Sequence, residues 1–217
     1  MGNRYRPLSI VTFAIEYGIV GDLNPGLSHF INIVLYFITA VLLLYVLNMM
    51  FRNYNAKYWW LSIPFIASVL FVAHPIHVEA VANIKGRDEI MSMLFSTAAL
   101  IAALRYSDGR KWPWMLTSSV LYFLALLSKE NAITFLAVIP LTIYFFSRDG
   151  LSRSWTLMGA LLLTTIAYLT LRFNTAGVPD FKNEITDLFN NPFYGMTGFE
   201  KLGTKMYTLG KYILLLI

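Results

Sequence analysis

The stretch of sequence that decides the fold is His74-Pro-Ile-His-Val-Glu-Ala-Val-Ala-Asn-Ile-Lys-Gly-Arg-Asp-Glu89. It holds two of the three histidines with several acidic and basic side chains, and the apolar runs on either side, 59–73 and 90–104, carry no charge. Charged groups are costly inside a lipid bilayer, so an ionisable cluster between two long apolar segments is a candidate functional site. The alternative is a water-exposed loop between two helices, where charge costs little.

The composition is that of a membrane protein. Of 217 residues, 57% are hydrophobic and 13% are charged, whereas soluble domains carry about 25% charged residues. The net charge of +5 does not call for nucleic acid as a partner, because cations beside membrane helices contact lipid headgroups and set orientation. The absence of cysteine excludes disulfides and thiolate metal sites.

The apolar runs predict an all-α fold, a polytopic bundle of transmembrane helices. Spanning helices need about 17–25 apolar residues. Residues 1–26 are predicted to be an interfacial segment on the outer face, 172–204 an outer loop, and 205–217 the start of a seventh span. Because the chain ends inside an apolar run, we expect one membrane-embedded domain, 1–217, truncated at both ends. Between 27 and 171 we expect about six complete spans, at 27–50, 59–74, 89–106, 112–128, 131–147 and 154–171.

The charges in the loops predict the orientation. Three short loops on one face carry a dense set of cations, which favours the cytoplasm for that face. The opposite face, periplasmic or luminal, then carries 75–88, the turn 128–131 and 172–204. We expect an integral membrane protein of the bacterial inner membrane or the endoplasmic reticulum. The cations that carry this argument are Arg52, Lys57, Arg105, Arg110, Lys111, Arg148 and Arg153.

Two groups of cationic residues have the chemistry of anion binding. Arg4 and Arg6 precede Pro7, which favours the start of a helix, and guanidinium groups bind phosphate bidentately. The alternative for both is contact with lipid headgroups. His74 and His77 could hold a metal, but their spacing is not the helical His-Glu-x-x-His arrangement, so we predict no metal site. The histidines are expected either to donate hydrogen bonds to an anionic ligand or to cap helix ends.

The end of the first stretch and the turn 128–131 contain further candidates. Gly86 is predicted to close a short helix in the left-handed conformation, and Asp88 to cap the helix that follows. Capping does not explain Arg87, which keeps a functional interpretation. The turn holds Lys129 and Glu130 over the end of the bundle, and the alternative there is a solvated ion pair.

The motifs also carry a resemblance. They resemble, in their order along the chain, the membrane domain of the transmembrane and tetratricopeptide-repeat O-mannosyltransferases and their bacterial relatives, within the C-type glycosyltransferases. The resemblance extends over essentially the whole chain, and each motif alone is weak. It rests on Tyr5-Arg-Pro-Leu8, the region of Phe30 and Asn32, His74-Pro-Ile-His-Val-Glu-Ala-Val81, Gly86-Arg87 and Leu127-Ser-Lys-Glu130.

The resemblance implies a membrane enzyme whose site opens to the periplasm or lumen. It would transfer a sugar, typically mannose, from a polyprenyl-phosphate carrier to Ser or Thr hydroxyls of a protein acceptor. Members of the family carry catalytic acids upstream of the Arg-Pro-Leu motif, with later helices and a repeat domain downstream. Because this chain contains none of these, we expect an internal fragment that keeps a phosphate-binding half-site and lacks turnover, and whether it is itself an enzyme stays open.

The residues present match the charge that such a reaction develops. The departing lipid phosphate becomes negative, and fixed cationic donors stabilise it without a metal or cofactor. Glu79 is the nearest substitute for the missing acid, although we expect it mainly to organise His77 or Arg87, with Glu130 and Asn131 in support. The alternative is a non-catalytic transporter-like or scaffold protein whose charges pair locally and face water. The predicted phosphate-binding residues are Arg4, Arg6, His74, His77, Arg87 and Lys129.

Overall fold

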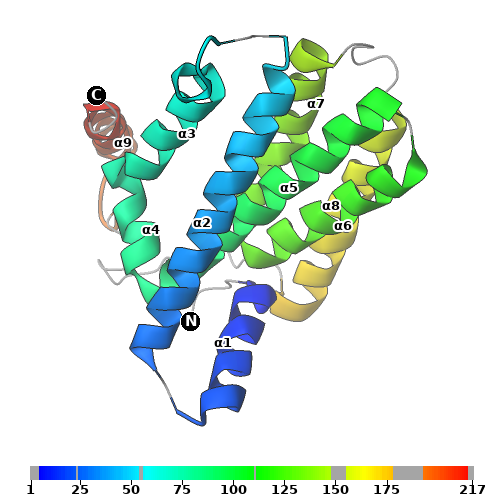
Figure 1. Ribbon diagram of the computed structural model, residues 1–217. Coiled ribbons are helices and arrows are strands. Elements are labelled where there is room, and N and C mark those ends of the chain that lie inside the picture. The colour runs from blue at the N-terminus through cyan, green and yellow to red at the C-terminus, as the bar shows by residue number, and fades with distance from the viewer. Residues whose placement is uncertain are drawn as a thin grey trace. The chain divides into compact units, whose positions relative to one another are not determined.

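A computed structural model describes residues 5–22, 24–53, 56–109, 111–147, 155–177 and 193–214. All regular structure in these ranges is helical, which confirms the all-α class (Figure 1). The chain forms two compact units, Met1–Ala176 and Gly177–Ile217. A single domain over 1–217 stays a prediction.

The first unit is built from α-helices joined by short 3₁₀ helices. Prolines at the first or second helical position help to start α1, α2, α3 and α6, where their missing N–H costs nothing. Asn24 also caps α2, because its side chain accepts a hydrogen bond of 3.1 Å from the Leu27 N–H. The α-helices are α1 (Pro7–Val20), α2 (Pro25–Met50), α3 (Ile63–Ala73), α4 (Val78–Ala82), α5 (Arg87–Gly109), α6 (Trp112–Ser128), α7 (Phe135–Phe146) and α8 (Trp155–Ala176). The 3₁₀ helices are η1 (Trp59–Leu61), η2 (Pro75–His77), η3 (Ile84–Gly86) and η4 (Glu130–Thr134).

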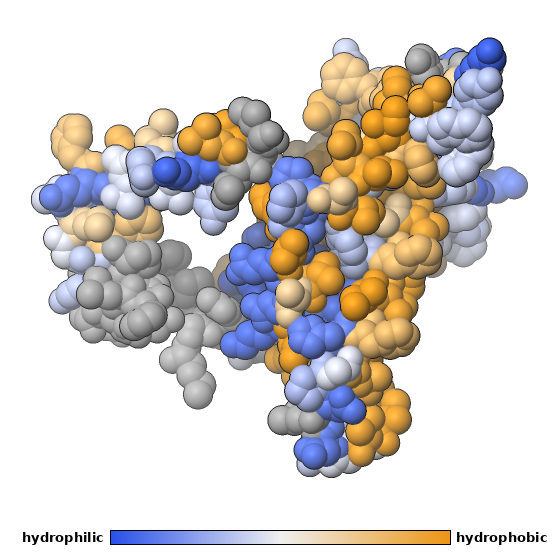
Figure 2. Space-filling model, turned by 60° about the vertical axis from the view of Figure 1, so that its left-hand side comes forward, coloured by the Kyte–Doolittle hydropathy of each residue, from blue (hydrophilic) through white to orange (hydrophobic). Residues whose placement is uncertain are grey.

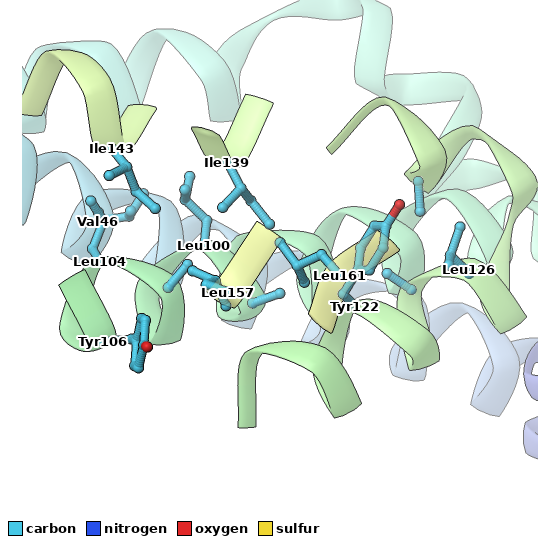
Figure 3. Packing of buried hydrophobic residues seen from close by; sticks show 14 of the residues in the cluster. Val46, Leu100, Leu104, Tyr106, Tyr122, Leu126, Ile139, Ile143, Leu157 and Leu161 are labelled. Carbon is cyan, nitrogen blue, oxygen red and sulfur yellow. The ribbon is translucent and has the colours of Figure 1, made fainter. Parts of the chain in front are cut away.

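Helix α5 lies at the centre of this unit. It packs most extensively against α6 and then against α2. Ala99 and Ala103 of α5 are fully buried, and such small side chains let neighbouring helices approach closely. Around them lie aliphatic side chains of α2, α5, α7 and α8 (Figure 3). The packed core therefore holds the second half of α5, and the charged stretch 74–89 ends at the other end of the same helix.

Three helices are long and apolar enough to cross a membrane: α2, the continuous segment Ile84–Gly109, and α8. A fourth span results if α3 and the segment Pro75–Ala82, which are bent by 51°, count as one. The bend follows from Pro75, which disfavours helical backbone at the preceding residue, and His74 is extended there. Helices α1, α6 and η4–α7 are shorter apolar helices, so about six complete spans is not confirmed in the described part of the chain.

The surface of the chain is rich in exposed apolar side chains, as the space-filling view shows in orange (Figure 2). On α2 these include Phe30 and Phe37, residues that are 62% and 66% exposed. A water-soluble protein rarely exposes such extended apolar surface, so lipid is its natural environment. This agrees with an integral membrane protein.

Two local predictions at the start of α5 are wrong. Gly86 has no left-handed backbone, since the positive-φ glycines of the described residues are Gly21, Gly177 and Gly195. Instead η3 continues right-handed into α5, and a Cβ atom built on Gly86 would lie 2.1 Å from the backbone oxygen of Ala80. Asp88 is not the N-cap either; it lies in the first turn of α5, and its carboxylate pairs with Arg6.

The second unit contains α9 (Gly198–Leu214). The predicted span that begins near 205 is not confirmed in the described residues, where α9 begins at Gly198 and carries four charged side chains, Glu200, Lys201, Lys205 and Lys211. It is not among the helices apolar enough to cross a membrane. The predicted outer loop 172–204 begins within α8 and ends within α9. Residues 178–192 and 215–217 lie outside the described residues.

Candidate functional site

A cleft of about 1040 Å³ opens at the N-terminal end of α5 in the first unit. Its volume is at the upper end of the range for small-molecule sites. Both charged and apolar side chains line it, from α1, α2, the bent segment α3–α4 and α5. The polar residues of its wall are Arg6, Ser9, Tyr36, Thr39, His77, Glu79, Asn83, Lys85, Asp88, Glu89 and Lys129.

The cleft brings together Arg6, His77, Glu79 and Lys129, four of the residues singled out from the sequence. They come from positions up to 123 residues apart. The remaining candidates in the described part of the chain lie elsewhere: His74, Arg87, Glu130 and Asn131 are not among the residues that line the cleft. Arg4 lies outside the described residues.

Arg6 joins the start of α1 to the ends of two other helices. Its Nε and Nη2 donate to the two carboxylate oxygens of Glu130, over 3.2 and 3.1 Å, and its Nη1 donates to Asp88. Burial alone would lower the pKa of Arg6, but the hydrogen bonds and charges of these two carboxylates raise it above its usual value. Arg6 therefore stays cationic at the rim of the cleft.

Lys129 lies beside Arg6 in the cleft wall and forms an ion pair with Glu89 of α5. The Glu89 side chain is 47% exposed, so this pair faces the opening rather than the core. Arg6 and Lys129 are thus both held by carboxylates at the cleft wall. An anionic ligand would have to compete with Asp88, Glu89 and Glu130 for them.

Arg87 lies in the packed interior between α1, α2 and α5, and none of its side chain is exposed. Its Nε donates to Asn32 Oδ1 over 2.9 Å, and its Nη2 donates to the Ser28 carbonyl over 3.1 Å. Its Nη1 pairs with Glu16, and the guanidinium lies 4.1 Å from the ring centre of Phe13. This placement differs from the direct phosphate contact that the sequence predicts.

The two histidines have different roles in the local structure. His74 caps η2, since its Nδ1 accepts a hydrogen bond of 3.2 Å from the Ile76 N–H, which is the capping alternative left open by the sequence. The His77 ring lies against Phe71, with 4.3 Å between ring centres, and borders the cleft. Among the described residues, no group of three or more His, Asp or Glu side chains converges on a point that could hold a metal ion.

Glu79 lies exposed in the cleft wall. No hydrogen bond or ion pair joins its side chain to another described residue, which differs from its expected role as an organiser of His77 or Arg87. Asn131 is exposed, and its carbonyl accepts a hydrogen bond of 2.9 Å from Thr134. Glu130 accepts two hydrogen bonds from Arg6, and its supporting role in the site stays a prediction.

Two residues of this region are missing from the sequence candidates. Lys85 lines the cleft, and its position within the charged stretch was a sufficient signal. Glu16 pairs with Arg87 and accepts a hydrogen bond of 2.6 Å from Ser28. A single acid in the apolar run 10–20 was the available signal, because a charge in such a run needs a partner.

A second hollow, of about 530 Å³, lies at the opposite ends of α2 and α5. Arg52 and Asp108 form an ion pair of 2.8 Å in its wall, and Arg105 lies over the Trp114 ring at 5.2 Å. Lys111 completes the cationic lining. These are cations of the predicted cytoplasmic face, while Arg110, Arg148 and Arg153 lie outside the described residues.

The pKa of Glu130 gives the first prediction. Burial alone would raise this pKa, but the hydrogen bonds and charge of Arg6, aided by Arg172, lower it below its ordinary value of 4.5. A lowered folded-state pKa contributes stability that is present above the unfolded pKa and is lost as pH falls through the folded pKa. We expect the stability of the protein in detergent to fall as the pH drops below about 5.5 and on through the folded-state pKa of Glu130, and Glu130→Gln to make that fall shallower. Equal slopes for both proteins, measured by thermal unfolding, would contradict this assignment.

The fold and the cleft define a class: helical membrane proteins with a charged cleft at one end of the bundle. The chain is 32% identical to the human protein O-mannosyl-transferase TMTC2 over 139 residues, which are 62% of this chain and 16% of the relative. It is 31% identical to human TMTC3 over 137 residues, 62% of this chain and 14% of the relative. The protein O-mannosyl-transferase F38B6.6 of Caenorhabditis elegans is 31% identical over 198 residues, 90% of this chain and 27% of the relative.

These similarities show that the chain belongs to the TMTC family of membrane proteins. It spans about a quarter or less of the length of the relatives given above. No family model and no solved structure matches the chain.

Proposed function

We propose that this chain is the membrane part of a glycosyltransferase that moves mannose from a polyprenyl-phosphate carrier to Ser or Thr hydroxyls of a protein acceptor. The observation that carries the proposal is one cleft that collects Arg6, His77 and Lys129 in a chain whose relatives are named protein O-mannosyl-transferases. The donor is a membrane lipid, so a cleft at the end of a membrane bundle is a suitable place for it.

The proposed reaction breaks the bond between the anomeric carbon of mannose and the phosphate oxygen. The bonding electron pair leaves with the phosphate, while the acceptor hydroxyl oxygen forms a new bond to the anomeric carbon. The hydroxyl proton passes to a carboxylate, and Glu79 is the candidate within the cleft. Arg6, His77 and Lys129 face the growing negative charge on the phosphate, where fixed donors lower the barrier.

In this proposal Arg87 and His74 are positioning residues. Arg87 holds the first turn of α5 against α1 and α2, and that turn carries Asp88 and Glu89 to the cleft. His74 caps η2 and thereby places His77. Lys85 adds a further cation at the opening.

The proposal includes six spans and an outward-facing cleft. The two shorter apolar segments are α6 (Trp112–Ser128) and η4–α7 (Glu130–Phe146), and each contains 17 residues. At about 1.5 Å per residue they are about 26 Å long, close to the hydrocarbon thickness of about 30 Å. The cleft would then open to the periplasm or to the lumen of the endoplasmic reticulum, with the Arg52–Asp108 end in the cytoplasm.

The alternative function is a non-catalytic transporter-like or scaffold protein. The ion pairs Arg6–Asp88 and Lys129–Glu89 favour it, because that alternative expects the charges to pair locally. It also expects no cavity between them, whereas these residues border a cleft of about 1040 Å³. Binding of a lipid phosphate separates the two functions.

The test measures binding of a fluorescent polyprenyl phosphate to the protein in nanodiscs. Lys129→Gln removes a charged donor and is expected to weaken binding about tenfold. Glu89→Gln removes the carboxylate that competes for Lys129 and is expected to strengthen binding. Arg52→Gln, at the other end of α2, is the control and is expected to leave affinity unchanged.

Further ligands test whether binding depends on the phosphate and on the sugar. Polyprenol without phosphate is expected to bind weakly, and the mannose-bearing carrier more tightly than one that bears glucose. Equal binding of polyprenol and polyprenyl phosphate, or equal affinities for Lys129→Gln and Glu89→Gln, would overturn the proposal and favour the scaffold alternative.

A further inference from the structure

Local hydrogen bonds determine where helix α9 begins. The Thr197 N–H donates to the Glu200 carboxylate over 2.7 Å, and the Glu200 N–H donates back to Thr197 Oγ1 over 3.4 Å. Reciprocal bonds of this kind form a capping box, which starts a helix through local contacts alone. The capping box thus sets the start of the 17-residue helix Gly198–Leu214, whose stability comes mainly from burying its apolar face.

One face of α9 is apolar and exposed. Its side chains recur at intervals of three and four residues, which places them in a single stripe along the helix. Each of them is at least half exposed, from 50% at Ile213 to 90% at Phe199. The stripe consists of Phe199, Leu202, Met206, Leu209 and Ile213.

The rest of the helix surface is cationic and polar. Lys211, Thr204 and Thr208 lie on the face opposite the stripe. Lys201 lies toward that face, and Lys205 borders the stripe beside Leu209. The single acid of the helix, Glu200, is engaged in the capping box. Aromatic rings whose polar tips favour the membrane–water boundary flank the stripe, at Tyr207 and Tyr212.

We propose that α9 lies in the plane of the membrane surface and binds anionic lipid headgroups. The apolar stripe would enter the boundary between headgroups and acyl chains, and the lysines would contact lipid phosphates. A spanning position would place several charges in hydrocarbon, which is costly, whereas the surface position satisfies both faces. This inference does not rest on the proposed function of the cleft.

The absence of cysteine makes a direct test available, because a single introduced cysteine can carry a spin label. Leu209→Cys places the label in the apolar stripe, and the matched control Thr208→Cys places it on the opposite face. In liposomes that contain phosphatidylglycerol, the label at 209 is expected to be more accessible to oxygen and less accessible to a water-soluble nickel chelate than the label at 208. Its depth should be shallow, about 5–10 Å below the headgroups.

Three outcomes would overturn the proposal. Labels at both positions near the bilayer centre would show a spanning helix. Equal access of the nickel chelate to both would show a helix in water, and exclusion of both reagents from position 209 would show that protein covers the stripe.

Lipid charge provides the second arm of the test. Lys201, Lys205 and Lys211 are replaced together by Gln, and the depth of the label at 209 is compared between phosphatidylglycerol and phosphatidylcholine liposomes. The parent protein is expected to insert more deeply in the anionic liposomes, and the triple variant is expected to lose that difference. Lys57→Gln, in the first unit, is the control that should retain it. A depth independent of lipid charge in the parent protein would contradict the role of the lysines.

Discussion

Replacing Arg87 with Met is expected to lower the free energy of unfolding by about 3–5 kcal/mol. The guanidinium is fully buried, and it bonds to Glu16, Asn32 and the Ser28 carbonyl. Removing it leaves the Glu16 carboxylate, only 13% exposed, without its cation. Breaking a buried pair from one side is costly because the remaining charge stays out of water.

A second variant separates the stability lost with the ion pair from the stability lost with side-chain packing. Glu16→Gln combined with Arg87→Met removes both charges, so the double variant is expected to be more stable than Arg87→Met alone. Unfolding by sodium dodecyl sulfate, followed by tryptophan fluorescence in mixed micelles, would measure the differences. Arg52→Met is the control, because the Arg52–Asp108 pair is partly exposed and is expected to contribute about 1 kcal/mol at most. If Arg87→Met and Arg52→Met have similar effects, the buried network does not stabilise the fold.

Gly86→Ala is expected to destabilise the protein by about 1–3 kcal/mol or more, although it adds only one methyl group. The new Cβ would lie 2.1 Å from the Ala80 oxygen and 2.8 Å from the Ala80 Cα. Backbone atoms cannot rotate away as a flexible side chain can, so α4 and η3 would have to separate. Both residues line the cleft, and we therefore also expect weaker binding of polyprenyl phosphate.

Gly159→Ala is the matched control for this effect. Gly159 lies inside α8, and a Cβ atom there would meet nothing within 4 Å. Alanine has the higher helix propensity, by about 1 kcal/mol, so this variant is expected to be at least as stable as the parent protein. Thermal unfolding in detergent would compare the two. A Gly86→Ala protein as stable as Gly159→Ala would show that the close approach of Ala80 is not needed.

The segments that became helices were predictable because their signals are local. The long apolar runs predicted α2, α5, α6 and α8, whose limits fall within about five residues of the expected ones. Pro25 and Pro113 mark the starts of α2 and α6. Hydropathy also identified a membrane protein, and the charged stretch 74–89 did supply His77 and Glu79 to the cleft wall. Each of these inferences needs only composition, spacing or a residue's own backbone preference.

The partners of the charged residues were decided by the tertiary structure. Arg6 and Glu130 are 124 positions apart, and Arg87 and Glu16 are 71 apart, so no local pattern links them. Arg6 and Arg87 carry the same group, yet one borders a cleft and the other lies in the core. The packing of α1 and α2 against α5 makes that difference.

By itself, the sequence determined the helical membrane class, the approximate helix limits and the stretches with enough charged residues to form a site. The tertiary structure alone decided which of those residues share a cleft, why Gly86 must lack a side chain, and that the apolar stripe of α9 is left exposed. The physical reason is that hydropathy measures what a segment costs in water or lipid, whereas the environment of a side chain depends on which helices pack beside it.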